Sequence, residues 1–284
     1  MVFKIERWDP STLPDHPRIL FIGRSGSGKS VAMMDILSNL ANRIDLCLLF
    51  SPTTDSIKQF EKVAPPGCIY PGGLNLEIVE TALKLNRENA ERKKARELFI
   101  VADDVAATDK RLLSSPVMRD GLMNGRHACC GWALSLQYVM DVPVDARSQF
   151  QIIVVCAENN QMNRRRIWQQ FGGVVPTFRE FDAIMSHCTQ DHSCLVIDNS
   201  NPSASIQTSL FHWKARLSRL RTSCANPSAS IQTSLFHWKA RLSRLCKPVY
   251  WSLDAKRPQV KKENVLVVDE KPKADARRTM VVVS

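Results

Sequence analysis

Residues 23–30 of the chain read GRSGSGKS and match the pattern G-x-x-x-x-G-K-[ST] at every fixed position. The apolar run RILFI at 18–22 precedes them, and the run KSVAMMDILSNL follows from Lys29 to Leu40. Glycines let a loop turn tightly enough for its backbone N–H groups to surround an anion, and the next helix adds the positive end of its dipole. The segment therefore predicts a strand, a phosphate-binding loop and a helix, in that order. The alternative, a glycine- and serine-rich loop that matches by chance, leaves the strand and helix unexplained.

The loop residues are expected to bind the phosphates of a nucleoside triphosphate. The candidate cofactor-binding residues are Gly23, Arg24, Ser25, Gly26, Ser27, Gly28, Lys29 and Ser30. The Lys29 ammonium is expected to contact the β- and γ-phosphates, and the Ser30 hydroxyl is expected to ligate Mg²⁺. The chain contains no N-K-x-D motif, which reads guanine, so ATP is favoured over GTP.

A second motif supplies two carboxylates. The apolar run at 98–102 reads LFIVA and is followed by Asp103 and Asp104. Ligands of open α/β sheets bind at the carboxyl ends of the strands, where these two side chains would lie. Asp103 is the candidate Mg²⁺ ligand, and Asp104 is the candidate catalytic residue that polarises the attacking water. An aspartate pair that caps a helix is the structural alternative.

Short apolar runs alternate with helical stretches along the rest of the chain. The predicted strands are 45–50, 98–102, 132–136 and 151–156, and a charged helix is predicted from 76 to about 96. The runs CLVID at 194–198 and IQTSLFHW at 206–213 predict a C-terminal hairpin. This order indicates an α/β fold with a mainly parallel sheet flanked by helices.

The C-terminal part contains an exact internal repeat. Residues 201–220 recur without a change at 226–245, and two copies are too few for a solenoid. A recent duplication or an artefact of gene assembly explains the repeat better. The expected organisation is an irregular lead-in (1–17), a P-loop ATPase domain (18–220), the duplicated copy with its linker (221–245) and a basic, partly disordered tail (246–284).

Charge and cysteine content restrict the partners and the compartment. The 39 Lys and Arg against 28 Asp and Glu give a net charge of +11. This excess favours a polyanionic partner, nucleic acid first and an anionic membrane second, over a merely basic surface. No apolar run reaches the ~18 residues of a membrane span, and no secretory signal is recognisable. Nine cysteines without framework spacing indicate a reducing, intracellular location.

Together these motifs resemble the packaging ATPases of nucleocytoplasmic large DNA viruses, the poxvirus-type branch of the FtsK/HerA P-loop motors. NGRH at 124–127, CCGWALSLQ at 129–137 and the terminal CLVIDN…LFHWKA extend the likeness over roughly residues 18–215. The resemblance implies a RecA-like core in a homo-oligomeric ring that hydrolyses ATP to move double-stranded DNA, without sequence preference, into a capsid. It also implies capsid proteins as partners, and the host cytoplasm at virus assembly sites, or the virion, as the location.

The resemblance assigns roles to three further residues. Gln137 would sense the γ-phosphate from the end of its strand, with an ordinary strand-end amide as the alternative. Arg147 or Arg126 would be the arginine finger that a neighbouring subunit receives, with a surface ion pair as the alternative for each. Many FtsK/HerA motors carry Glu at the position of Asp104, and the poxvirus-type branch resembles this chain there.

Other clusters have weaker functional interpretations. His187, Cys188, Asp191, His192 and Cys194 could together hold Zn²⁺, although burial of Cys194 in a strand is the simpler reading. The run 164–166 (RRR) could contact a phosphate backbone or form a solvated helix face. A small-molecule P-loop kinase and a nucleotide-binding scaffold with little hydrolysis remain the alternative functions.

Overall fold

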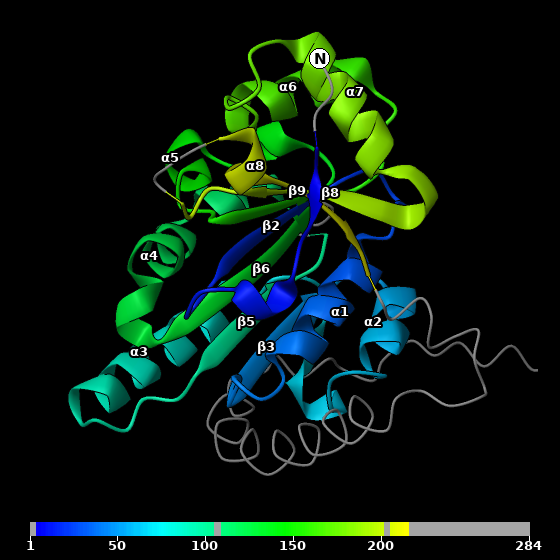
Figure 1. Cartoon of the computed structure of the whole chain (residues 1–284). Helices are drawn as coiled ribbons and strands as arrows, with labels where there is room; N and C mark the ends of the chain where they lie inside the picture. The colour runs from blue at the N-terminus through cyan, green and yellow to red at the C-terminus, as the bar shows by residue number, and fades with distance from the viewer. Residues whose placement is uncertain (1–3, 105–108, 202–204, 216–284) are drawn as a thin grey trace, which may run out of the picture.

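The computed structural model describes residues 4–104, 109–201 and 205–215. Its centre is one sheet with helices on both faces (Figure 1). The duplicated copy (221–245) and the expected tail (246–284) lie outside the described residues. Within the described part of the chain, no helix has the length and apolarity needed to cross a membrane.

The sheet has the order β1-β9-β8-β7-β2-β6-β5-β3-β4. The strands are β1 (Glu6–Arg7), β2 (Arg18–Ile22), β3 (Leu46–Ser51), β4 (Ile69–Pro71), β5 (Leu98–Ala102), β6 (Cys130–Leu136), β7 (Ile152–Val155), β8 (Ser193–Asp198) and β9 (Leu210–Lys214). All neighbouring pairs are parallel except those that β8 makes with β7 and β9. The expected mainly parallel α/β sheet with a closing hairpin is therefore confirmed.

The helices form separate layers on the two faces. They are α1 (Lys29–Leu40), α2 (Thr54–Phe60), α3 (Leu76–Glu91), α4 (Pro116–Asn124), α5 (Val144–Arg147), α6 (Gln161–Phe171), α7 (Phe178–Cys188) and α8 (Ile206–Ser209). In Figure 1, α1 and α2 lie together on one side of the sheet, and α3, α4 and α5 lie on the other. Helices α6 and α7 pack on each other near β8. Covering both faces is what a parallel sheet requires, because its central strands are apolar on both sides.

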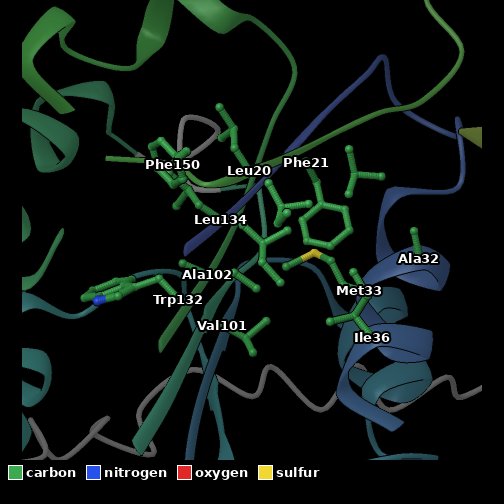
Figure 2. Close-up of a cluster of buried hydrophobic side chains, with 14 of the residues drawn as sticks. Leu20, Phe21, Ala32, Met33, Ile36, Val101, Ala102, Trp132, Leu134 and Phe150 are labelled. Atoms are coloured by element: carbon green, nitrogen blue, oxygen red, sulfur yellow. The ribbon is translucent and has the colours of Figure 1, made fainter. Parts of the chain in front are cut away.

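The burial pattern explains the position of the central strands. Every residue of β2, β5, β6 and β7 is buried, as their continuous apolar runs predict. On one face, Phe21 of β2 points toward Met33 of α1, and Ile36 lies one turn further along the helix (Figure 2). Trp132 of β6 lies on the opposite side and donates from Nε1 to the carbonyl of Gly121 in α4. The core thus fixes α1, and with it the loop that precedes the helix.

Three local expectations need correction. The lead-in 1–17 is not wholly irregular, because Glu6–Arg7 forms β1 and pairs with β9 at the sheet edge. Helix α3 ends at Glu91 rather than near residue 96, since the charged run after it has no apolar face to bury. Residues 206–209 form α8 instead of the start of a strand, because Ser205 and Thr208 make a reciprocal capping box.

Candidate active site

The loop of residues 23–30 joins the carboxyl end of β2 to α1. Gly26 and Gly28 have φ angles of 73° and 96°, in the left-handed region that residues with a Cβ rarely adopt. No side chain caps the amino end of α1. The first backbone N–H groups of the helix are thus left for an anion, as in phosphate-binding loops.

Gly23 packs tightly against the carboxyl end of β7. A Cβ on Gly23 would lie 2.8 Å from the Cβ of Cys156 and 2.7 Å from Oγ of Ser27. The Gly23 N–H donates to the carbonyl of Leu136 at 3.2 Å, which also ties the loop to β6. The start of the loop is therefore held by the strands on both sides of β2.

Lys29 is held inside the loop. Its side chain is buried, and Nζ donates to the carbonyls of Gly23 at 2.7 Å and Arg24 at 3.0 Å. These bonds use two of the three ammonium N–H groups. The positive charge therefore lies within the loop itself, where the sequence predicts the β- and γ-phosphates.

A row of polar residues crosses the sheet beside this loop. Phe50 pairs with Ala102, and Ala102 pairs with Leu134, so the next residue of each strand falls in one row. That row consists of Ser51, Asp103 and Ser135. All three residues are buried at the carboxyl ends of β3, β5 and β6. They lie on the face that α1 covers, because successive side chains of a strand alternate between faces.

Three hydroxyl groups surround the Asp103 carboxylate. Ser135 Oγ donates to Oδ1 at 2.7 Å, while Ser51 Oγ and Ser30 Oγ lie 3.4 Å and 3.3 Å from Oδ2. The sequence motifs predicted Ser30 and Asp103, but they did not identify Ser51 or Ser135. Carboxylate and hydroxyl oxygens are hard donors that suit Mg²⁺, so the donor set of Ser30 and Asp103 fits the metal that ATP chemistry requires.

Asp104 has an unusual backbone conformation. Its φ angle is 47°, which is uncommon for a residue other than glycine and is found at functional sites. Its N–H donates to Ser135 Oγ at 2.9 Å, and Gln137 Nε2 lies 3.4 Å from both carboxylate oxygens. The structure therefore brings Asp104 and Gln137 together at the carboxyl ends of β5 and β6, next to Asp103.

A buried network behind Gln137 was missed at the sequence level. Asn163 of α6 donates from Nδ2 to the carbonyl of Gln137 at 3.2 Å and to Oε2 of Glu158 at 2.5 Å. Glu158 is buried in the segment after β7, and its carbonyl accepts from Arg164 at 3.1 Å. This network fixes the backbone at the end of β6 and so the position from which the Gln137 side chain extends.

The two finger candidates occupy different environments. The Arg147 side chain is buried, donating from Nε to the carbonyl of Val142 at 2.9 Å and from NH1 to Oε1 of Gln170 at 2.8 Å. Burial lowers the pKa of the Arg147 guanidinium from its usual value. Arg126 is exposed in the turn before β6, at the end of the sheet opposite the loop. Neither arginine reaches the loop of its own chain.

Two thiols lie under the loop. Cys156 and Cys194 are buried, and their Sγ atoms are 3.5 Å apart across β7 and β8. The hydrogen bond with Cys194 lowers the pKa of the Cys156 thiol, and the positive charge of Lys29 acts in the same direction. The same contact raises the pKa of Cys194.

The weaker interpretations of two segments find little support. Burial raises the pKa of Cys188 to about 11, and the thiol of Cys194 faces Cys156 instead of its neighbours in the sequence. The donors of residues 187–194 therefore do not form a Zn²⁺ site. Among the described residues, three possible metal ligands instead meet at His16, Glu97 and Cys129, far from the loop along the sheet.

The first arginine of the run 164–166 is used within the fold. Arg164 is buried, and its Nε donates to Oδ1 of Asp182 in α7 at 2.5 Å. Arg165 lies over the ring of Phe178, with 4.5 Å between its Cζ and the ring centroid. A phosphate-contacting face made by all three arginines is therefore not present.

The mainly parallel sheet, the glycine loop and the two carboxylates at the carboxyl end of β5 define a protein of the P-loop ATPase fold. Residues 6–207 match the model of the family described as Poxvirus A32 protein. The chain belongs to this family, which confirms the resemblance to the packaging ATPases of nucleocytoplasmic large DNA viruses.

The chain is also similar to proteins of other large viruses and, in its fold, to solved structures. Uncharacterized protein L437 of Acanthamoeba polyphaga mimivirus is 26% identical over 227 residues, covering 75% of this chain and 78% of its own. Uncharacterized protein 075L of Invertebrate iridescent virus 6 is 28% identical over 198 residues, which cover 69% of this chain and 76% of that protein. The structure of EssC (ATPases 2 and 3) from Geobacillus thermodenitrificans has a TM-score of 0.51 at 12% identity, covering 84% of this chain and 45% of that one. The genome packaging NTPase B204 of Sulfolobus turreted icosahedral virus 2 has a TM-score of 0.48 at 16% identity, covering 66% of this chain and 94% of that one.

Proposed function

We propose that the protein is an ATP-hydrolysing motor that moves double-stranded viral DNA into the capsid. One observation carries this proposal: Lys29, Ser30, Asp103, Asp104 and Gln137 converge at one edge of the sheet, beside the phosphate loop. Family membership and the net charge of +11 support DNA as the polyanion on which the motor acts.

Each residue then has a separate task in the reaction. Loop amides and the Lys29 ammonium bind the phosphates, and Ser30 and Asp103 hold Mg²⁺, which neutralises phosphate charge when bound. Asp104 accepts a proton from water as the water oxygen bonds to the γ-phosphorus and the bond to the β–γ bridging oxygen breaks. Gln137, through its amide beside Asp104, responds to the presence of the γ-phosphate.

The motor is proposed to work as a homo-oligomeric ring. Of the two arginine candidates, Arg126 is exposed, and it is the stronger candidate for contact with a neighbouring subunit. Capsid proteins are the proposed docking partners. Virus assembly sites in the host cytoplasm are the proposed location, with the virion as a second one.

Phosphate release with and without double-stranded DNA tests the proposal. A motor should hydrolyse ATP in the presence of Mg²⁺, run faster with DNA of any sequence, and lose this stimulation between low and moderate salt as counterions compete. Lys29→Ala serves as the matched inactive control. Rapid hydrolysis at a rate that DNA does not change would contradict the proposed motor function. ATP consumption only in the presence of a small-molecule acceptor would identify a kinase.

A further inference from the structure

A pocket of about 370 Å³ opens directly beside the phosphate loop. Gly28, Val31 and Ala32 line it from the loop and the first turn of α1. Asp191 and His192, in the turn between α7 and β8, and Lys214 at the end of β9 line it from the other side. The volume lies within the range of small-molecule sites.

We propose that this pocket binds the nucleoside part of the triphosphate, with His192 against the base and Asp191 at the ribose. The inference rests on the proposed function, because it assumes that the loop holds the phosphates. The loop and the pocket share Gly28, and Val31 directly follows the last loop residue. A ligand with its phosphates on the loop therefore has its remaining part within reach of this pocket.

The chemistry of the walls matches a nucleoside. Val31 and Ala32 present an apolar surface on one side, and the His192 imidazole offers a flat ring of the kind that stacks on bases. The Asp191 carboxylate accepts hydrogen bonds and so suits the ribose hydroxyls. Lys214 adds a cation at the same opening, which favours a ligand that carries negative charge.

The turn that supplies Asp191 and His192 has an energetically unfavourable backbone conformation. Their φ angles are 50° and 60°, so two consecutive residues other than glycine lie in the left-handed region. Such conformations persist only where the surrounding structure fixes them. Here α7 and β8 hold the turn from both ends, and the result is that both side chains line the pocket.

This assignment gives a role to two residues of the segment 187–194, which was considered above as a Zn²⁺ site. Asp191 and His192 become specificity-determining residues that recognise the nucleoside, whereas the loop binds only the phosphates. Recognition of ATP is thereby divided between the loop with α1 on one side and the turn before β8 with the end of β9 on the other.

Calorimetric titration of the full chain with the non-hydrolysable β,γ-methylene analogue of ATP (used as ATP in the outcomes below) and with inorganic tripolyphosphate, both with Mg²⁺, tests the proposal. His192→Ala should weaken ATP about tenfold, as loss of one stacked base contact does, and leave tripolyphosphate unchanged. His192→Phe should keep most of the ATP affinity because it retains a flat ring. Asp191→Asn should weaken ATP and have a smaller effect on the 2′,3′-dideoxy analogue.

His187→Ala is the matched control, because His187 is an exposed histidine on α7 outside the pocket lining. It should bind both ligands like the unaltered chain. Unchanged ATP affinity in both His192→Ala and Asp191→Asn would overturn the proposal, and so would equal weakening of ATP and tripolyphosphate. Absence of hydrolysis or of DNA stimulation would instead count against the proposed motor, since these titrations measure binding alone.

Discussion

At the scale of single residues, Lys29 and Asp104 act on different parts of the reaction. Lys29→Ala removes the charge held in the loop and should abolish tight ATP binding. Asp104→Asn keeps the Asp103 carboxylate and the loop, so ATP should still bind while hydrolysis slows by orders of magnitude. Nucleotide titration combined with phosphate release measures both effects. Normal turnover of Asp104→Asn would place the base elsewhere.

Gly23→Ala tests how closely the loop must approach β7. The added Cβ would lie 2.8 Å from the Cβ of Cys156, so the loop has to move away from the strand. We expect weaker binding of both ATP and tripolyphosphate, measured by titration. The double variant with Cys156→Gly removes the Cys156 Cβ and should recover part of the affinity. Full affinity in the single variant would mean that the observed approach is not needed for binding.

Local motifs predicted the residues whose partners are close in the sequence. Lys29 and Ser30 lie in one loop, and Asp103 ends a recognisable strand. Ser51 and Ser135 could not be predicted in the same way, because they reach Asp103 only through the register of three strands. Glu158 and Asn163 act on Gln137 through α6, and no spacing in the sequence connects these residues to the end of β6.

At the scale of the elements, Arg147 connects α5 to α6. Arg147→Ala would leave the Val142 carbonyl and the Gln170 amide oxygen without this donor, at a cost of about 2 kcal/mol. We expect a loss of several degrees in Tm by calorimetry. Arg126→Ala, at an exposed side chain, should leave Tm unchanged. An unaltered Tm in Arg147→Ala together with lost hydrolysis would favour Arg147 as the finger.

Elements marked by a clear apolar pattern could be predicted from the sequence. Elements that depend on a neighbouring strand or on a capping interaction could not. The bounds of α1 and β5 follow from apolar runs, which are buried over most of α1 and throughout β5. The two-residue strand β1 has no pattern of its own and exists because β9 offers an edge. The run IQTSLFHW was expected to form one strand of the hairpin, but the Ser205–Thr208 capping box makes its first half helical.

For the whole molecule, the repeated segment makes a specific prediction. Strand β9 takes its sequence LFHWK from the first copy, and the second copy offers the same five residues at 235–239. Deleting residues 221–245 should therefore leave ATPase activity and Tm nearly unchanged, because the described sheet is already complete. Light scattering should show improved solubility, since one apolar segment is removed. Unfolding or loss of hydrolysis after this deletion would mean that the second copy is part of the fold.

The pairing of β1 with β9 also has a consequence for how the protein is made. Glu6 is synthesised 205 residues before its partner Phe211. At roughly 5–20 residues per second, Glu6 waits on the order of 10 seconds or more for that partner. The second copy of the β9 sequence follows 1–5 seconds behind, roughly, at the same rate. The nascent chain thus offers the first copy to β8 before the second copy has been synthesised, so the order of translation favours the first copy as β9.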